Sequence, residues 1–390
     1  MEGLQYGDAH THSDKTSDQV EFGVPVNAAI LLAQSMGLTY FCVADHSYDL
    51  DDSPADYTVN HPDIPKWGDL TREVKLANAR NRKFAVIQGE EISCRNDEGR
   101  NVHFLLFGNK EFFSGSGDSA EQWFKTHSEH SIADILARKD SGAVAFAAHP
   151  SEPVPFLQRL LLARGAWTTA DFSQHGLAGI QFANGAAGEG FSEGYSAWVA
   201  MLLRGHRLFC LAGNDAHGNF NRYRQIGIPF VSIREHGEQL FGRMRTAVYL
   251  EGRPGQRAVL ESLAAGSFVI TDGPCINVTD STDKESPTVI GRTLRRGKRN
   301  LVFSAVSSGE FGALQNLVVY GGIVGEKEES VVAHEQISGK FRHTITISTS
   351  GLPYSYLRVE ARTSPFNASD RRSHFCITNP IWLTGTSVRH

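Results

Sequence analysis

The feature that most constrains this chain is a series of short apolar runs, most of which end in histidine, aspartate or glutamate. These polar residues are His10, His12, Asp45, His46, Glu91, His103, His149, Asp215 and His217. Because side chains that leave neighbouring strand ends can converge, residues that are distant in sequence can share one site. Together they offer enough nitrogen and oxygen ligands for two or three divalent ions. The pattern therefore predicts a multinuclear metal site and hydrolysis by activated water.

Strand and helix patterns alternate from the first residues to about residue 250. The helices are expected at residues 26–36, 70–83, 119–138, 155–165 and 192–205. The runs between them are short, apolar and continuous, which is typical of about seven parallel strands covered on both faces. Because the polar residues gather at strand ends, we expect an α/β fold with a distorted, TIM-like barrel over residues 1–270. His103 stands near the start of its run, so its strand is expected to run the other way or to be irregular.

The sequence changes character after about residue 270. A helix is expected at residues 255–265, and short β-rich runs follow it. Glycine, serine, asparagine and charged turns separate these runs. The pattern predicts that residues 271–390 form a small antiparallel β domain, with a sandwich as the expected arrangement.

Composition argues against several classes of protein. The 390 residues are 41% hydrophobic and 21% charged, as in an ordinary globular protein. A net charge of −5 disfavours long nucleic acid as a partner. We expect no membrane span, because no run of about 18 apolar residues is present, and no signal peptide. The five cysteines are far apart and odd in number, which favours a reducing, cytoplasmic location.

Spacing adds detail to the first predicted ligands. One residue separates His10 from His12, so both side chains can project to one side and hold one ion. Asp14 and Asp18 follow in the same polar turn. Either aspartate can add an oxygen ligand there, and a helix cap or a solvated turn is the alternative interpretation of both.

The later candidates include a carboxylate suited to bridging. Glu91 can bind two ions at once, and Glu90 beside it is the alternative. Asp215 and His217 repeat the spacing of the first pair. A mixture of carboxylates and imidazoles suits Zn, Mn or Fe better than Ca or Mg.

Three further residues are candidates for a direct role in the reaction. Asp45 follows a buried strand, and it or a ligand imidazole would orient water or transfer a proton. Arg222 and Arg224 follow the last predicted ligands, and arginines beside a metal site can bind an anion through two hydrogen bonds. A surface loop is the alternative interpretation of the two arginines.

Taken in order, these segments resemble the motifs of the PHP (polymerase and histidinol phosphatase) family of metallohydrolases. GDAHTH resembles the first motif, VADHS the second, GEEI with NVHFLLFG the middle section, AHP the third and GNDAHG the fourth. The resemblance covers roughly residues 5–220. It implies a distorted (β/α)7 barrel with two or three divalent ions.

The same resemblance implies a ligand set for each ion. The first ion would be held by His10, His12, Glu91 and Asp215. The second would be held by Glu91, His103 and His149. The third would be held by His46, His217 and an acidic residue of the first turn. The family often has SDG soon after HxH, whereas this chain has Ser17-Asp18-Gln19 one residue further along, so Asp18 is the candidate acid and a two-ion site is the alternative.

The later segments RTAVYLEG, AAGSFVITDGP, YLRVEAR and FCITNPIWL are similar to a group of stand-alone PHP proteins that includes enzymes resembling carbaryl hydrolase. The family as a whole implies a small phosphoester as substrate, and this branch implies a carboxylester or carbamate. A nuclease acting on short oligonucleotides and a non-catalytic binding protein are the other two hypotheses. The expected partner is a small, anionic molecule, and a homo-oligomer is left open.

Overall fold

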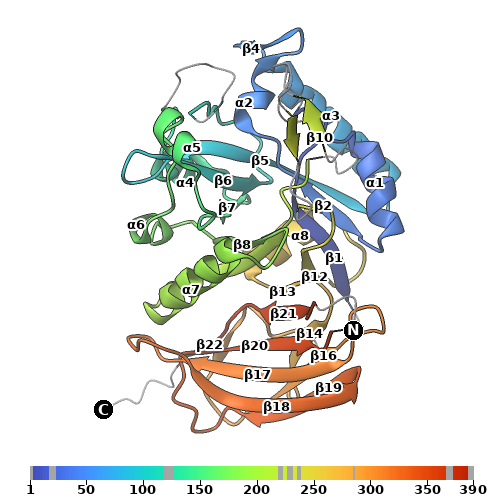
Figure 1. Ribbon diagram of the computed structural model, residues 1–390. Coiled ribbons are helices and arrows are strands. Elements are labelled where there is room, and N and C mark those ends of the chain that lie inside the picture. The colour runs from blue at the N-terminus through green and yellow to red at the C-terminus, as the bar shows by residue number, and fades with distance from the viewer. Residues whose placement is uncertain are drawn as a thin grey trace.

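The computed structural model describes residues 3–16, 23–117, 119, 127–217, 223–225, 232–234, 239–283, 286–365 and 372–384. The fold is mixed α/β. An N-terminal part combines a curled sheet with helices, and the orange and red C-terminal strands lie below it in Figure 1.

Seven strands form the curled sheet, in the order in which they occur along the chain. They are β1 (Leu4–Thr11), β2 (Tyr40–Val43), β5 (Ala85–Arg95), β6 (Asn101–Phe107), β7 (Val144–Ala148), β8 (Gly179–Asn184) and β9 (Phe209–Gly213). The chain after β9 returns to β1, where the Asp215 N–H donates to the His10 carbonyl at 2.9 Å and the His12 N–H donates to the Ala216 carbonyl at 3.0 Å. The last strand of the curl therefore lies beside the first.

Gly213 permits this close approach. A Cβ atom at that position would lie 2.5 Å from the Cβ of His10 and 2.7 Å from its backbone nitrogen. Any larger residue would push β9 away from β1. The glycine thus brings the ends of both strands, and the polar residues that follow them, to one place.

The sheet is mixed rather than wholly parallel. β1, β2 and β5 are parallel to one another, and so are β7, β8 and β9. β6 is antiparallel to both of its neighbours. The prediction that the His103 strand runs the other way is confirmed. The prediction of parallel strands that are each separated by a helix is wrong at this point, because a short turn joins β5 to β6.

The helices form where apolar residues recur at helical spacing. In α1 (Val26–Ser35) the buried residues Val26, Ala29, Ile30 and Ala33 line one face. The other helices of this part are α2 (Ser47–Leu50), α3 (Pro65–Arg80), α4 (Ile132–Arg138), α5 (Phe156–Leu161), α6 (Thr169–Phe172), α7 (Glu189–Leu203) and α8 (Gln256–Ala265). A small hairpin of β3 (Asp52–Ser53) and β4 (Asp56–Asn60) follows α2.

One predicted helix is shorter than expected. The sequence pattern predicts a helix over residues 119–138, but in the described part of that segment the helix begins only at Ile132. Ser131 ends the preceding non-helical stretch, because its hydroxyl caps the helix by accepting a hydrogen bond from the Asp134 N–H at 3.2 Å.

The curled sheet continues through β1 into the C-terminal strands. β12 (Arg245–Tyr249) pairs antiparallel with β1, β13 (Phe268–Thr271) with β12, and β21 (Phe375–Thr378) with β13. The predicted domain boundary between residues 270 and 271 falls inside β13, and the division into two domains stays a prediction. A separate hairpin is formed by β10 (Tyr223–Gln225) and β11 (Ser232–Arg234).

The C-terminal strands form two mainly antiparallel layers over one apolar core. One layer contains β14 (Cys275–Asp280), β16 (Asn300–Val306) and β19 (Arg342–Ser348). The other contains β21 with β15 (Thr293–Arg295), β17 (Leu314–Gly322), β18 (Ser330–Lys340), β20 (Tyr356–Thr363) and β22 (Ile381–Thr384). Phe303 of the first layer and Val359 of the second belong to the same buried cluster.

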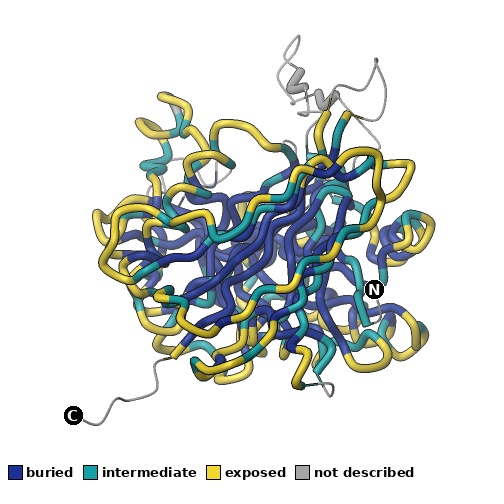
Figure 2. Tube along the Cα trace, turned by 90° about the horizontal axis from the view of Figure 1, so that it is seen from below, coloured by how far each residue is buried: buried dark blue, intermediate teal, exposed yellow. Residues whose placement is uncertain are grey.

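A buried arginine ties these strands to α7. Arg358 of β20 is fully buried, pairs with Glu329 and Glu360, and lies 5.1 Å from the ring centroid of Tyr195 and 5.4 Å from that of Trp198 on α7. Figure 2 shows that the buried trace runs through the middle of the molecule and that the exposed residues gather on its loops. Within the part of the chain that the structure describes, no helix has the length and apolar character needed to cross a membrane.

Candidate metal centre

Six imidazoles and two carboxylates meet in the interior where β1, β2, β5, β6, β7 and β9 end or curve. They belong to His10, His12, His46, His103, His149, His217, Glu91 and Asp215. Three overlapping groups of ligand atoms, each within 4.8 Å of one another, occur among the described residues. They are His10 with His12, Glu91 and Asp215; His46 with Glu91 and His103; and His12 with His46 and His217. The cluster therefore offers nitrogen and oxygen donors that can hold metal ions.

The first histidine pair is presented by the irregular end of β1. The register between β1 and β2 shifts between Asp8 and Thr11, so the chain bends where the two imidazoles begin. Both rings are buried, and their centroids are 5.2 Å apart. The Nε2 atoms of His10 and His12 both lie near Asp215 Oδ1, at 3.6 Å and 3.0 Å respectively.

Glu91 lies at the centre of the cluster. Its Oε2 is 3.2 Å from His10 Nε2 and 3.1 Å from His46 Nδ1. Its Oε1 is 2.7 Å from His103 Nδ1 and 2.9 Å from His149 Nε2. His12 Nε2 also lies 3.5 Å from Oε2. The two oxygens thus face different sets of imidazoles, which suits a carboxylate shared by two ions.

Glu90, the alternative to Glu91, points to the other face of β5, because successive side chains of a strand alternate. Its Oε2 accepts a hydrogen bond from the Phe113 N–H at 3.2 Å. Burial raises the pKa of this carboxyl well above its usual value, and the nearby Asp51 raises it further. Glu90 is therefore a neutral, buried acid outside the cluster.

Two of the clustered residues adopt backbone conformations that residues other than glycine rarely adopt. His149 has a φ of 27° directly after β7, and Asp215 has a φ of 51° shortly after β9. Such strained residues persist where the surrounding structure holds them, and they are concentrated at functional sites. Here the conformation turns each side chain toward the other ligand candidates.

The protonation states also suit metal binding. Burial raises the pKa values of Glu91 and Asp215, but the surrounding imidazoles outweigh burial and hold both pKa values well below the usual range. Burial lowers the pKa of His12 well below its usual value, and the neighbouring His217 and His46 lower it further. Ionised carboxylates and a neutral imidazole are the forms that bind metal ions.

His10 is the exception, because it stands between both carboxylates. Burial disfavours its imidazolium, but Glu91 and Asp215 outweigh burial and raise the pKa of His10 to about 9. Its Nδ1 lies 2.9 Å from Gln181 Oε1. A hydrogen bond donated by Nδ1 to this oxygen leaves Nε2 facing the two carboxylates, as in a metal-ligating histidine held by an outer partner.

The third group consists of imidazoles only. The rings of His12 and His217 are stacked with centroids 3.9 Å apart, and those of His12 and His46 are 4.5 Å apart. The first-turn acids do not complete this group among the described residues. Asp14 pairs with Lys15 at 2.9 Å, and Asp18 lies outside the described residues.

Asp45, a candidate for water orientation or proton transfer, lies beneath the turn that follows the first histidine pair. Its carboxylate accepts hydrogen bonds from the Ser13 N–H and hydroxyl, both at 2.6 Å, and from the Thr16 hydroxyl at 3.0 Å. Burial raises the pKa of Asp45, and these donors oppose the rise. In this arrangement the side chain holds the turn in position.

Comparison with known proteins does not help to identify this site. No protein-family model matches the chain, and no curated protein is significantly similar to it. The chemistry of the donor set therefore carries the argument. Buried imidazoles and carboxylates that converge in this way can hold divalent metal ions.

Of the two arginines expected to bind an anion, Arg222 lies outside the described residues, and Arg224 lies in β10, of which only the backbone is described. The structure instead brings Arg164 to the cluster, where its Nη2 is 3.5 Å from His103 Nδ1. Arg164 and Gln181 escaped prediction from sequence. Arg164 follows a helix rather than a strand, and an amide within a strand carries no signal of metal chemistry.

Proposed function

We propose that the protein is a metal-dependent hydrolase of the PHP type, with a distorted barrel around a centre of two or three divalent ions. The observation that supports this most strongly is Glu91, whose two oxygens face different sets of imidazoles. A structural ion needs one closed set of four ligands, whereas a bridging carboxylate is characteristic of catalytic centres with two metals. The order of the sequence motifs supports the same proposal.

Each supporting residue has a separate role in the proposed metal centre. Divalent ions supply Lewis acidity and bring the pKa of water close to neutrality. Gln181 fixes the orientation of His10, Asp45 holds the turn that carries His12, and Glu91 would supply ligand atoms to more than one ion. Arg164 provides a cationic group beside His103 that can hold an oxygen of an anionic substrate.

The substrate that we propose is a small phosphoester. Three observations favour it: the cationic side chain at the cluster, a pocket beside the cluster with a volume of about 700 Å3, and a net charge of −5, which disfavours long nucleic acid. A carboxylester or carbamate would use the same water, so the ligand set by itself does not distinguish between these bonds.

The test begins with metal-free protein reloaded separately with Zn, Mn and Fe(II). We expect metal-dependent hydrolysis of 4-nitrophenyl phosphate, and its loss in Glu91→Gln, a variant of the same shape without the bridging charge. Hydrolysis of 4-nitrophenyl acetate or an aryl carbamate without hydrolysis of the phosphate would replace the phosphoester by the carboxylester or carbamate. Degradation of a short 5′-phosphorylated oligonucleotide in place of both would identify a nuclease. A protein that binds none of the metals would overturn the proposal.

A further inference from the structure

A pocket of about 700 Å3 adjoins the metal centre on the side of His103 and His149. Arg164 lines it and also lies 3.5 Å from His103 Nδ1. Glu152 lines it as well, and its Oε2 is 3.9 Å from His149 Nδ1. Arg164 and Glu152 therefore connect the pocket with two candidate ligands, although none of the candidate ligands lines the pocket itself.

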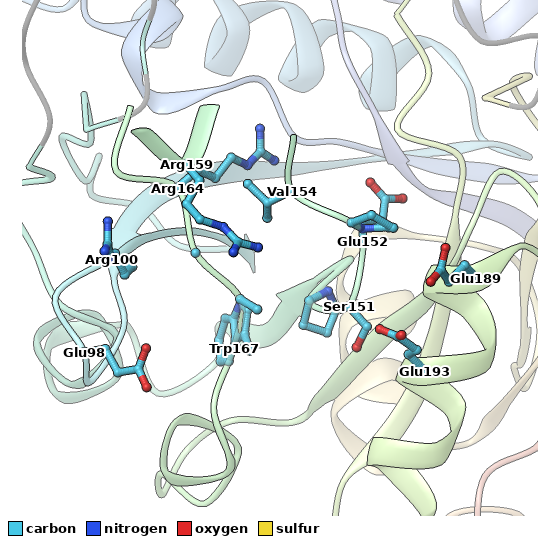
Figure 3. Close-up of a pocket in the computed structure, with 14 residues that line it drawn as sticks. Glu98, Arg100, Ser151, Glu152, Val154, Arg159, Arg164, Trp167, Glu189 and Glu193 are labelled. Carbon is cyan, nitrogen blue, oxygen red and sulfur yellow. The ribbon is translucent and has the colours of Figure 1, made fainter. Parts of the chain in front are cut away.

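The two sides of the pocket carry opposite charges. Figure 3 shows the arginines on one side, and three of the glutamates on the other. The arginines are Arg100, Arg159 and Arg164, and these glutamates are Glu152, Glu189 and Glu193. The fourth glutamate that lines the pocket, Glu98, lies on the side of Arg100. Among the described residues, no ion pair joins Arg100 or Arg159 to any of these glutamates. The two charged sides thus face each other across an open space.

This arrangement disfavours a ligand that carries charge of one sign only. An anionic group that filled the pocket would meet the glutamates, and a cationic group would meet the arginines. A hydroxyl group suits both sides, because it donates a hydrogen bond to a carboxylate and accepts one from a guanidinium. Several hydroxyls on one small, neutral framework would satisfy both sides at once, and the volume is within the usual range for small-molecule sites.

The three glutamates are exposed, but one of them, Glu152, is held in place by a neighbouring side chain. Glu152 Oε1 accepts a hydrogen bond from Asn184 Nδ2 at 2.6 Å. Asn184 Oδ1 in turn accepts one from Gln181 Nε2 at 3.2 Å, and Gln181 Oε1 contacts His10 Nδ1. A chain of hydrogen bonds therefore fixes an acceptor of the pocket relative to a ligand of the metal centre.

We propose that this pocket binds the part of the substrate that leaves after hydrolysis, and that this part is a sugar or another polyol. The glutamates accept hydrogen bonds from its hydroxyls, and the arginines donate to them. The identity of the bond that is cleaved rests on the proposed function, whereas the recognition of hydroxyls rests on the pocket itself.

The decisive comparison uses myo-inositol 1-phosphate and cyclohexyl phosphate with the metal-loaded protein. Both are monoesters of a six-membered ring, and they differ only in the hydroxyls. We expect kcat/KM to be at least about tenfold higher for the inositol ester, because a site built for hydrogen bonds discriminates against a ligand that lacks them. Equal kcat/KM values would overturn the proposal.

Two variants localise the effect to the pocket. Glu193→Gln and Arg159→Gln should each reduce the ratio between the two esters, with the larger loss on the inositol ester. The control is Glu328→Gln, an exposed glutamate between β17 and β18, which should keep the ratio of the unmodified protein. If the ratio of kcat/KM between the two esters is unchanged in both variants, the hydroxyls are recognised elsewhere and the inference is refuted.

A binding measurement separates this inference from the proposed function. If neither these esters nor 4-nitrophenyl phosphate is hydrolysed, the phosphoester hypothesis fails, but calorimetric titration with the same two ring esters still tests the pocket. Tighter binding of the inositol ester, weakened in Glu193→Gln and unchanged in Glu328→Gln, would support polyol recognition without catalysis. Equal affinity for both compounds would refute it.

Discussion

The proton on His10 should compete with metal binding. Glu91 and Asp215 overcome the effect of burial and raise the pKa of His10 to about 9, so this imidazole is protonated in the metal-free protein at neutral pH. A metal ion needs the neutral ring and must displace the proton. Two pKa units separate pH 7 from the pKa of about 9, so the affinity at pH 7 should be about 100-fold below its limiting value, or about 2.7 kcal/mol weaker. Affinity should rise about tenfold per pH unit and level off near pH 9.

The assay is competition between the metal-free protein and a chromophoric zinc chelator at several values between about pH 7 and about pH 9. The His10→Gln variant is the control, because its amide cannot bind the competing proton. The slope of log affinity against pH should be smaller in this variant by about one proton. Equal slopes in the two proteins would refute the reasoning, because the displaced protons would then come from other groups.

Three further substitutions test the supporting residues. Asp45→Asn removes the charge that holds the first turn, and the free energy of unfolding, measured with denaturant, should fall by about 1–3 kcal/mol; an unchanged midpoint would contradict the positioning role. Gln181→Leu removes the acceptor at His10 Nδ1 and should weaken zinc binding by about 10- to 100-fold. Gln181→Glu keeps an acceptor and should retain most of the affinity. Equal affinities in both variants would argue against an orienting hydrogen bond. Arg358→Met leaves the buried Glu329 without its cationic partner and should cost about 3–5 kcal/mol in the same unfolding assay, whereas a loss below about 1 kcal/mol would mean that water reaches this network.

Local patterns in the sequence are sufficient to predict many of the helices and strands of the N-terminal part. The spacing of apolar residues predicts α1, α3, α7 and α8 close to their observed positions, because helical periodicity is expressed within a few turns. The helix predicted over 119–138 is too long, since a serine cap starts it only at Ile132. The direction of β6 follows from the position of His103 near the start of its run, whereas the apolar runs alone do not report strand direction.

The candidate ligands likewise include residues that local patterns predict and residues that they do not. Polar residues that follow apolar runs are expected to meet, and the structure brings His10, Glu91 and Asp215 together from three separate strands or strand ends. Gln181 is not predictable in this way, because it is 171 residues away from His10 and its role depends only on where β8 lies relative to β1. The roles expected for Asp18 and Arg222 stay predictions, as both lie outside the described residues.

The sequence by itself determined which side chains can bind metal and placed most of them at the ends of strands, because residue type and short-range periodicity are local properties. Only the tertiary structure decided that Glu91 rather than Glu90 enters the cluster, since this depends on which face of β5 turns inward. It also decided that β9 reaches β1, which requires the bare backbone of Gly213 against His10. Distances between atoms of remote segments follow from the curvature and register of the whole sheet, and no short stretch of sequence contains that information.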